Sequence, residues 1–125
     1  MFTTINGYTK EKMKEVIRAN FKGKASDNGG GCYYLTEDGR RCAVGCFIDE
    51  ATLNNIDTPD LSMPVAELLE NYEEVQEIMP LGLDGLKVFQ SAHDTMFGST
   101  DPEVQKEILI NWIDNNVKDA NATAN

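Results

Sequence analysis

Most apolar positions in this chain recur at the spacing of an α-helix. In the first such segment Thr9 can cap the start and Gly23 marks the stop, because Thr side chains satisfy free helix N–H groups and Gly adopts the conformations that end helices. The apolar positions that share one face between them are Met13, Val16, Ile17 and Phe21. This pattern predicts a first helix.

The clearest amphipathic pattern runs from Pro64 to Met79. The positions on its apolar arc are Val65, Leu68, Leu69, Tyr72, Val75 and Met79. The positions on the opposite arc are Glu67, Glu70, Glu73, Glu74 and Glu77. Asn71 weakens the middle, because Asn has a lower helix propensity than these neighbours. We predict an amphipathic helix here with an acidic outer face.

Two further helices are predicted in the last third of the chain. The inward face of the first comprises Leu83, Leu86, Phe89, Gln90, His93, Met96 and Phe97. The second starts with Asp101 as its cap and Pro102 at the first helical position, where a missing N–H costs nothing. Its apolar positions are Val104, Ile108, Leu109, Trp112, Ile113 and Val117. They cover more than half of the circumference, which indicates a central helix or a helix that also meets a partner. A short helix is also expected after Asp49.

One segment has the pattern of strands instead. The apolar runs Cys32–Leu35 and Cys42–Ile48 flank an Asp38-Gly39 dipeptide, which is typical of a tight hairpin turn. A hairpin alone is only marginally stable, so it must lie against helices or recruit Phe2–Ile5 as a third strand. The expected fold is therefore α+β, with four or five helices packed on a β-hairpin or a small antiparallel sheet.

The length of 125 residues fits one core, and 41% hydrophobic residues can fill it. We expect one globular domain over residues 1–118 and a flexible C-terminal tail over 119–125. No stretch has the roughly 20 consecutive apolar residues that cross a bilayer, and the start of the chain does not resemble a signal peptide. The three cysteines are an odd number, which suits a reducing cytoplasm better than a disulfide framework.

Acidic residues outnumber basic ones by 21 to 11, for a formal net charge of −10. No Lys or Arg occurs between Cys42 and Leu86. Direct nucleic-acid binding is disfavoured, because phosphates would be repelled. Glutamates spaced three or four apart on one helix also repel each other. The charges of these glutamates could be compensated by a basic partner protein or by the basic stripe of the first helix. Alternatively, the acidic face is simply solvated. The residues of that stripe are Lys10, Lys14, Arg18 and Lys22.

Three cysteines and the single histidine are candidates for chemistry. Cys32, Cys42, Cys46 and His93 are residue types that ligate zinc, although no Cys-x-x-Cys spacing occurs. A three-residue hairpin loop would bring the cysteines to one face, and a two-residue loop would turn Cys32 to the other. Cys32 could also act as a nucleophile with His93 as base and Asp94 as orienting acid. The ordinary alternative is that these residues are buried core positions.

The segment from Cys32 to Glu50, with its Cys-Ala-Val-Gly-Cys-Phe-Ile run after an Asp-Gly turn, resembles small uncharacterised proteins of tailed bacteriophages. The later segment Phe89–Asp94 carries a second point of resemblance, an aromatic residue before His-Asp. The chain departs from the usual Ile-Pro-Asp after the first motif, having Ile48-Asp49-Glu50. The resemblance implies a phage accessory protein that acts in the bacterial cytoplasm.

These observations predict a non-catalytic protein that binds and inhibits a basic host protein through the acidic helix face. One alternative is a nucleotide-signal binder, in which the basic stripe and the loop Asp27–Gly31 contact the anion. Another is a cysteine enzyme or a zinc module at the cysteines and the histidine. Neither alternative requires a membrane.

Overall fold

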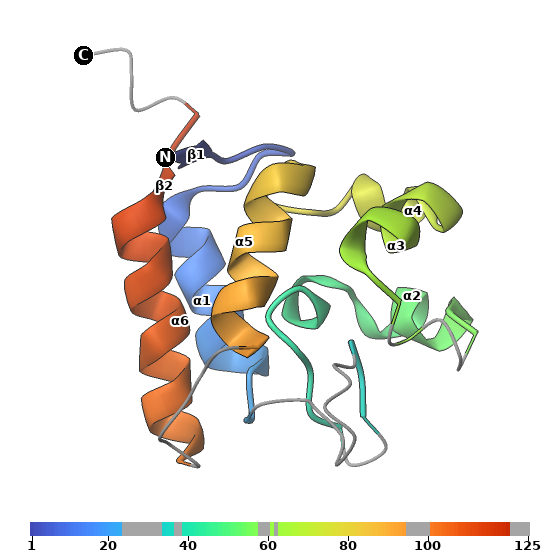
Figure 1. Ribbon diagram of the computed structural model, residues 1–125, viewed down its shortest axis with the longest axis horizontal. Coiled ribbons are helices and arrows are strands. Elements are labelled where there is room, and N and C mark those ends of the chain that lie inside the picture. The colour runs from blue at the N-terminus through green and yellow to red at the C-terminus, as the bar shows by residue number, and fades with distance from the viewer. Residues whose placement is uncertain (24–33, 37–38, 58–60, 62, 95–100, 121–125) are drawn as a thin grey trace.

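The computed structural model describes residues 1–23, 34–36, 39–57, 61, 63–94 and 101–120 (Figure 1). The helices, in chain order, are α1 (Lys10–Asn20), the 3₁₀ helix η1 (Gly45–Phe47), α2 (Glu50–Asn55), α3 (Val65–Asn71), α4 (Glu73–Gln76), α5 (Leu83–Asp94) and α6 (Pro102–Asn116). The strands are β1 (Phe2–Thr3) and β2 (Val117–Lys118). Helices α1, α5 and α6 lie side by side, and the short helices α2, α3 and α4 lie beyond α5.

Both predicted helix starts with a side-chain cap are confirmed. Thr9 Oγ1 accepts a hydrogen bond from the Lys12 N–H at 3.1 Å, and Asp101 Oδ1 accepts one from the Glu103 N–H at 2.9 Å. Each bond satisfies an N–H group that has no partner inside its helix. Pro102 occupies the first turn of α6, as its missing N–H allows.

The core forms where α1, α5 and α6 meet η1. Met13 and Ile17 of α1, Phe89 of α5 and Ile113 of α6 are all 0% exposed. The Phe89 and Trp112 rings lie 4.9 Å apart between α5 and α6. Aromatic pairs at such distances add to the energy of burial itself. The last helix is not central, however: α6 lies at one side of the molecule, and Val104 on its wide apolar face is 46% exposed (Figure 1).

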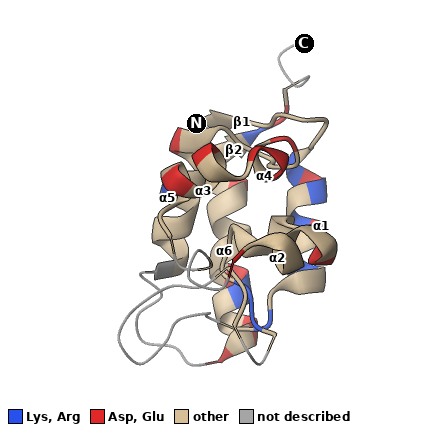
Figure 2. Ribbon diagram, turned by 90° about the vertical axis from the view of Figure 1, so that its right-hand side faces the viewer, with Lys and Arg blue, Asp and Glu red and all other residues tan. Residues whose placement is uncertain are grey.

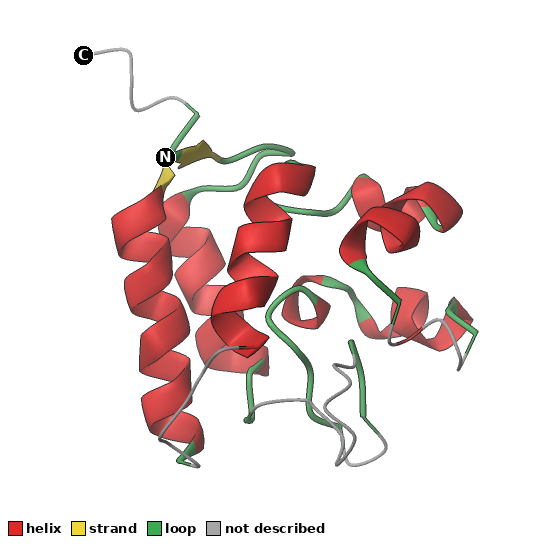
Figure 3. Cartoon of the chain, in the orientation of Figure 1, coloured by secondary structure: helices red, strands yellow, loops and turns green. Residues whose placement is uncertain are grey.

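The two strands join the chain ends. β1 and β2 pair in parallel, with Phe2 opposite Val117 and Thr3 opposite Lys118 (Figure 3). Beyond β2, the Ala120 N–H donates to Thr4 Oγ1 at 3.0 Å, and Asp119 Oδ1 accepts from the Lys10 N–H at the start of α1. The first residues of the chain thus form a strand, but its partner is the segment after α6.

The α+β prediction, with helices on a hairpin or antiparallel sheet, is wrong. The described chain is helix-dominated, and its only sheet is the parallel pair. The two ends of the predicted turn are joined, since the Thr36 N–H donates to Arg40 O at 2.9 Å, and Gly39 has φ +86°. The described residues that flank it form no strand pair, and the Tyr34 N–H donates to Leu61 O instead, at 2.8 Å. Cys32 and Tyr33 lie outside the described residues.

The second predicted strand folds into a tight turn because it is buried on every side. Every residue from Cys42 to Ile48 is buried, and the Cys46 N–H donates to Cys42 O at 3.1 Å. A short apolar run cannot be assigned to a strand or a buried helical turn by periodicity alone. Gly45 permits the turn, because a Cβ at this position would lie 2.1 Å from the Tyr34 carbonyl oxygen.

Candidate functional site

The five glutamates of the amphipathic segment are all exposed, and we call them the acidic surface. Figure 2 shows them as the red turns of α3 and α4. Beneath them Val65, Leu68 and Val75 are buried, so the predicted division into an inner apolar and an outer acidic side is confirmed. The residues of the acidic surface are Glu67, Glu70, Glu73, Glu74 and Glu77.

A break at Tyr72 divides the acidic surface between two helices. Tyr72 has φ −130° and ψ 83°, so α3 ends there and α4 starts at the next residue. Tyr72 Oη accepts a hydrogen bond from the Asp57 N–H at 3.2 Å, and Asn71 bonds back to Glu67 O at 3.0 Å. One continuous helix would stack these glutamates three and four apart, where like charges repel. The break replaces the single helix predicted over this segment.

The N-terminal segment holds α4 from the other side. Asn6 Nδ2 donates to Met79 O at 2.8 Å and to Gln76 O at 3.3 Å, while the Ile5 N–H donates to Pro80 O at 2.9 Å. Asn6 has φ +55°, a left-handed conformation that Asn tolerates better than most residues. These bonds satisfy carbonyls at the end of α4 and fix the acidic surface on the core. Sequence reasoning missed Asn6, although Asn-Gly is a recognised turn signal.

Within the described part of the chain, no glutamate of the acidic surface forms an ion pair with a Lys or Arg. The basic stripe of α1 therefore does not compensate the acidic surface. Like charges held together without counter-charges raise the free energy of the folded state by a few tenths of a kcal/mol per pair, about 0.2–0.5. A cationic partner would remove that cost.

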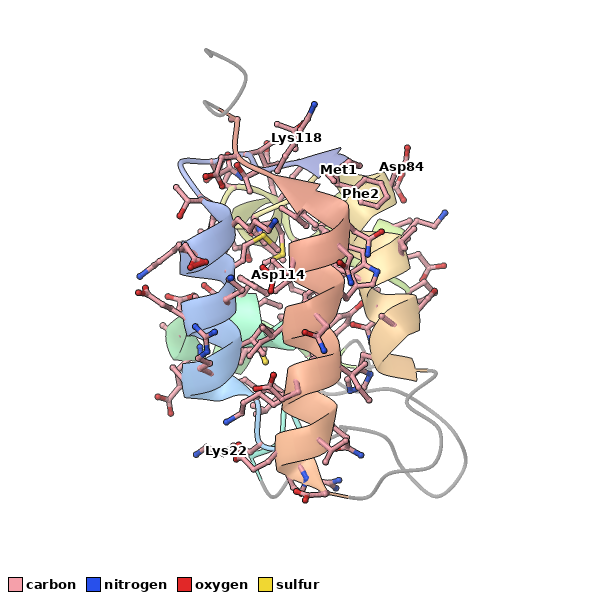
Figure 4. The ribbon with its side chains drawn as sticks, turned by 90° about the vertical axis from the view of Figure 1, so that its left-hand side faces the viewer. Met1, Phe2, Lys22, Asp84, Asp114 and Lys118 are labelled. Carbon is pink, nitrogen blue, oxygen red and sulfur yellow. The ribbon has the colours of Figure 1, made fainter. Side chains whose placement is uncertain are left out.

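Two residues of the basic stripe predicted on the first helix, Lys10 and Lys14, instead bind α6. Lys14 Nζ lies 2.8 Å from Asp114 Oδ1 and 2.7 Å from Glu11 Oε2, and Lys10 Nζ donates to Asp114 O at 2.8 Å. Figure 4 shows Asp114 on α6 beside α1. The hydrogen bond from Lys14 lowers the pKa of Asp114, and the bond to Asp114 raises the pKa of Lys14. Arg18 and Lys22 are exposed.

The described cysteines are buried thiols. Cys42 is 0% exposed and its Sγ accepts from the Gly45 N–H at 3.3 Å, while Cys46 is 2% exposed. Burial raises the pKa of the Cys46 thiol to about 12, so it is protonated at neutral pH. His93 is also buried, with its ring edge-to-face on Phe21 at 6.1 Å.

The zinc and nucleophile hypotheses depend on a residue that lies outside the described part of the chain, Cys32. The side chain of Asp94, the proposed orienting acid, is also outside it. Among the described residues there is no group of three His, Cys, Asp or Glu side chains that could hold a metal ion. The described residues therefore supply no assembled cysteine site.

The two segments that carry the phage resemblance pack against each other. Gln90 Oε1 accepts a hydrogen bond from the Val44 N–H at 3.3 Å, and the Phe47 and Phe89 rings lie 6.0 Å apart in a T-shaped pair. Gln90 is buried, so its bond to Val44 satisfies polar groups that water cannot reach. These contacts place both segments in the core and position η1 against α5.

No protein family matches the chain, and comparisons with curated proteins and with solved structures likewise give no match. The resemblance to phage proteins stays a prediction from the sequence. In the part of the chain that the structure describes, every helix is too short or too polar to cross a membrane.

Proposed function

We propose that this chain is a binding protein that recognises a positively charged protein surface through its acidic surface. In the setting that the phage resemblance implies, the protein is an accessory factor in the bacterial cytoplasm. The partner is then a host protein whose activity is inhibited when it is bound, as in host takeover or in the suppression of antiviral defence.

One observation carries this proposal: the five exposed carboxylates of α3 and α4 have no counter-charge within the described chain, whereas lysines of α1 are bound to α6. A surface with unpaired carboxylates gains more binding free energy from a cationic partner than a surface whose charges are already paired. Charge of one sign also steers a partner of the other sign during diffusion and raises the association rate.

The rigidity of the acidic surface adds support. Bonds from Asn6 fix the end of α4, and the bond between Tyr72 and Asp57 fixes the junction of α3 and α4. A binding surface that is already ordered loses less conformational entropy on association. Cysteine chemistry has less support, because the two described thiols are buried and the Cys46 pKa is raised.

The test is a capture experiment with a matched control. Tagged wild-type protein, the E70K/E74K variant and the E15K/E107K variant are incubated with bacterial host lysate, and bound proteins are identified by mass spectrometry. All four glutamates are exposed, and both variants change the net charge by the same amount. A genuine partner binds the wild type and E15K/E107K, and not E70K/E74K.

The captured protein is then purified and titrated by calorimetry. We expect its affinity for E70K/E74K to fall at least about tenfold, because two attractive contacts become repulsive. We also expect wild-type affinity to fall as NaCl is raised. Equal affinity for wild type and E70K/E74K would contradict the proposed function.

A further inference from the structure

A second charged surface lies at the C-terminal end of α1, and we call it the basic cluster. Its residues are Arg18, Lys22, Arg40, Arg41 and Lys106. They come from three separate regions of the chain and include five of its 11 basic residues. In Figure 2 blue segments of α6 and of the loop below α2 lie at the lower end of the molecule, with further blue segments along α1, whereas the red turns of α3 and α4 lie at its upper end. Figure 4 shows Lys22 at the same lower end.

Specific contacts bring these residues together. Lys106 Nζ donates to Arg18 O at 3.2 Å, which joins α6 to the last turn of α1. The chain turns at Gly23, whose φ is +127°, and Arg40 Cδ lies 3.7 Å from where a Cβ of Gly23 would be. This places Arg40 beside the residue that follows Lys22.

The remaining cation, Arg41, is tied to the same place. Both Arg41 and Lys106 act electrostatically on the Cys46 thiol. Arg41 Nη1 also donates to Ile48 O at 3.4 Å, just after η1. Arg41 thus joins the basic cluster through its electrostatic contact with Cys46 of η1, the 3₁₀ helix that packs against α1.

Three cations of the basic cluster, Arg18, Lys22 and Lys106, are at most partly compensated within the described residues. Glu103 Oε1 lies 3.6 Å from Lys106 Nζ, and this Glu side chain is 79% exposed. Arg18 and Lys22 are exposed, and neither forms an ion pair within the described residues. Salt screens charges beyond about 8 Å, so a local surplus attracts anions even on a chain with a net charge of −10.

We propose that the basic cluster binds a small anion that carries several phosphates, such as the phosphate chain of a nucleotide. Guanidinium groups match phosphate oxygens in pairs, and ammonium groups contribute point charge at adjacent oxygens. Several cations converging from different elements suit a multivalent anion better than a single carboxylate. This site differs from the stripe predicted along α1, because Lys10 and Lys14 are bound to α6 while Arg40, Arg41 and Lys106 join from elsewhere.

The experiment is calorimetric titration with sodium tripolyphosphate, at constant ionic strength maintained with NaCl. Wild type is compared with R18E/K22E and with K12E/K87E, in which two exposed lysines outside the basic cluster receive the same charge change. We expect saturable binding at one site in wild type and in K12E/K87E, and an affinity at least about tenfold weaker in R18E/K22E. A milder variant, K22Q, should give an intermediate affinity. Circular dichroism confirms that each variant is folded.

Titrations with ATP and with a ten-nucleotide single-stranded DNA identify the source of the phosphate groups that the basic cluster binds. Tighter binding of ATP than of tripolyphosphate supports a nucleotide, and equal binding supports recognition of the phosphate chain alone. Absence of saturable binding to either ligand overturns the proposal, as does equal weakening in R18E/K22E and K12E/K87E. Binding of a ten-nucleotide single-stranded DNA without binding of tripolyphosphate also overturns it, in favour of nucleic acid. None of these outcomes depends on the acidic surface.

Discussion

The carboxylate of Asp114 on α6 lies 2.8 Å from the ammonium group of Lys14 on α1. This contact joins two helices through residues that lie 100 positions apart in the chain. It also determines which cations remain on the surface, because Lys14 is only 13% exposed while Arg18 and Lys22 are exposed. The basic stripe thus has two parts: Lys10 and Lys14 hold α1 against α6, while the exposed Arg18 and Lys22 can meet ligands.

Replacing Asp114 with Asn should lower stability at pH 7, and the loss should disappear in acid. The pKa of Asp114 is lowered in the folded protein, so its ionised form stabilises the fold above its unfolded pKa, and this contribution is lost as the pH falls through the folded pKa. Urea unfolding of wild type and D114N between pH 7 and pH 2 measures the difference. E107Q, an exposed acid on the same helix, is the control. A gap between wild type and D114N that persists at the acid end would contradict this assignment.

Gly45→Ala should destabilise the fold strongly. The new Cβ would lie 2.1 Å from the Tyr34 carbonyl oxygen and 2.9 Å from its carbon, and backbone atoms cannot move aside as a flexible side chain can. Overpacking of this kind costs about 1–3 kcal/mol or more. Gly82→Ala is the control, since nothing lies within 4 Å of its added Cβ. Chemical denaturation should show a much lower midpoint for G45A than for G82A.

Asn6→Ala should loosen the end of α4, and Asn6→Gly should do so less. Both variants lose the bonds to Gln76 O and Met79 O, which should cost about 0.5–1.5 kcal/mol per bond, because one bond is exposed and the other only partly buried. Gly adopts the φ of +55° without the strain that Ala incurs there. Hydrogen exchange by mass spectrometry should show faster exchange in residues 73–79 for N6A than for N6G. Equal exchange in wild type and N6A would show that Asn6 does not hold α4.

Glu77→Lys should stabilise the isolated protein even though it removes part of the proposed binding surface. Glu77 follows Glu73 by four residues, and its N–H donates to Glu73 O at 3.3 Å, so the substitution turns a repulsion into an attraction. The gain should be about 0.2–0.5 kcal/mol in low salt and smaller in 1 M NaCl. E15K on α1 should give no such gain, because it adds a cation to a helix that already carries a basic stripe. Thermal unfolding of the two variants at both salt concentrations tests the difference.

Cys42 and Cys46 should resist alkylation in the folded protein. The Cys46 thiol has a pKa of about 12, and both sulfur atoms are shielded from solvent. Iodoacetamide at pH 8 should label them only after urea unfolding, with labelled peptides quantified by mass spectrometry. Rapid labelling of Cys46 without denaturant would show that η1 opens readily.

Local features of the candidate site were predictable from the sequence, and its assembly was not. The inward Val65, Leu68 and Val75 and the outward glutamates follow from helical periodicity, which depends only on neighbours in the chain. The break at Tyr72 depends on a bond to Asp57, and the fixing of α4 depends on Asn6, some 70 residues earlier. The basic cluster likewise needs Lys106 to reach the end of α1. Contacts between residues so far apart in the chain leave no pattern in the sequence around either residue.

The sequence by itself determined where α1 and α6 start, which helix faces are apolar, and where negative charge is concentrated, because capping, periodicity and composition act over a few residues. Only the tertiary structure decided that the run from Cys42 to Ile48 forms a turn with η1 and that β1 pairs with β2. Both outcomes depend on burial against distant segments: an apolar run follows whichever backbone path satisfies its hydrogen bonds inside the core. The same packing placed Asp114 of α6 beside Lys14 of α1.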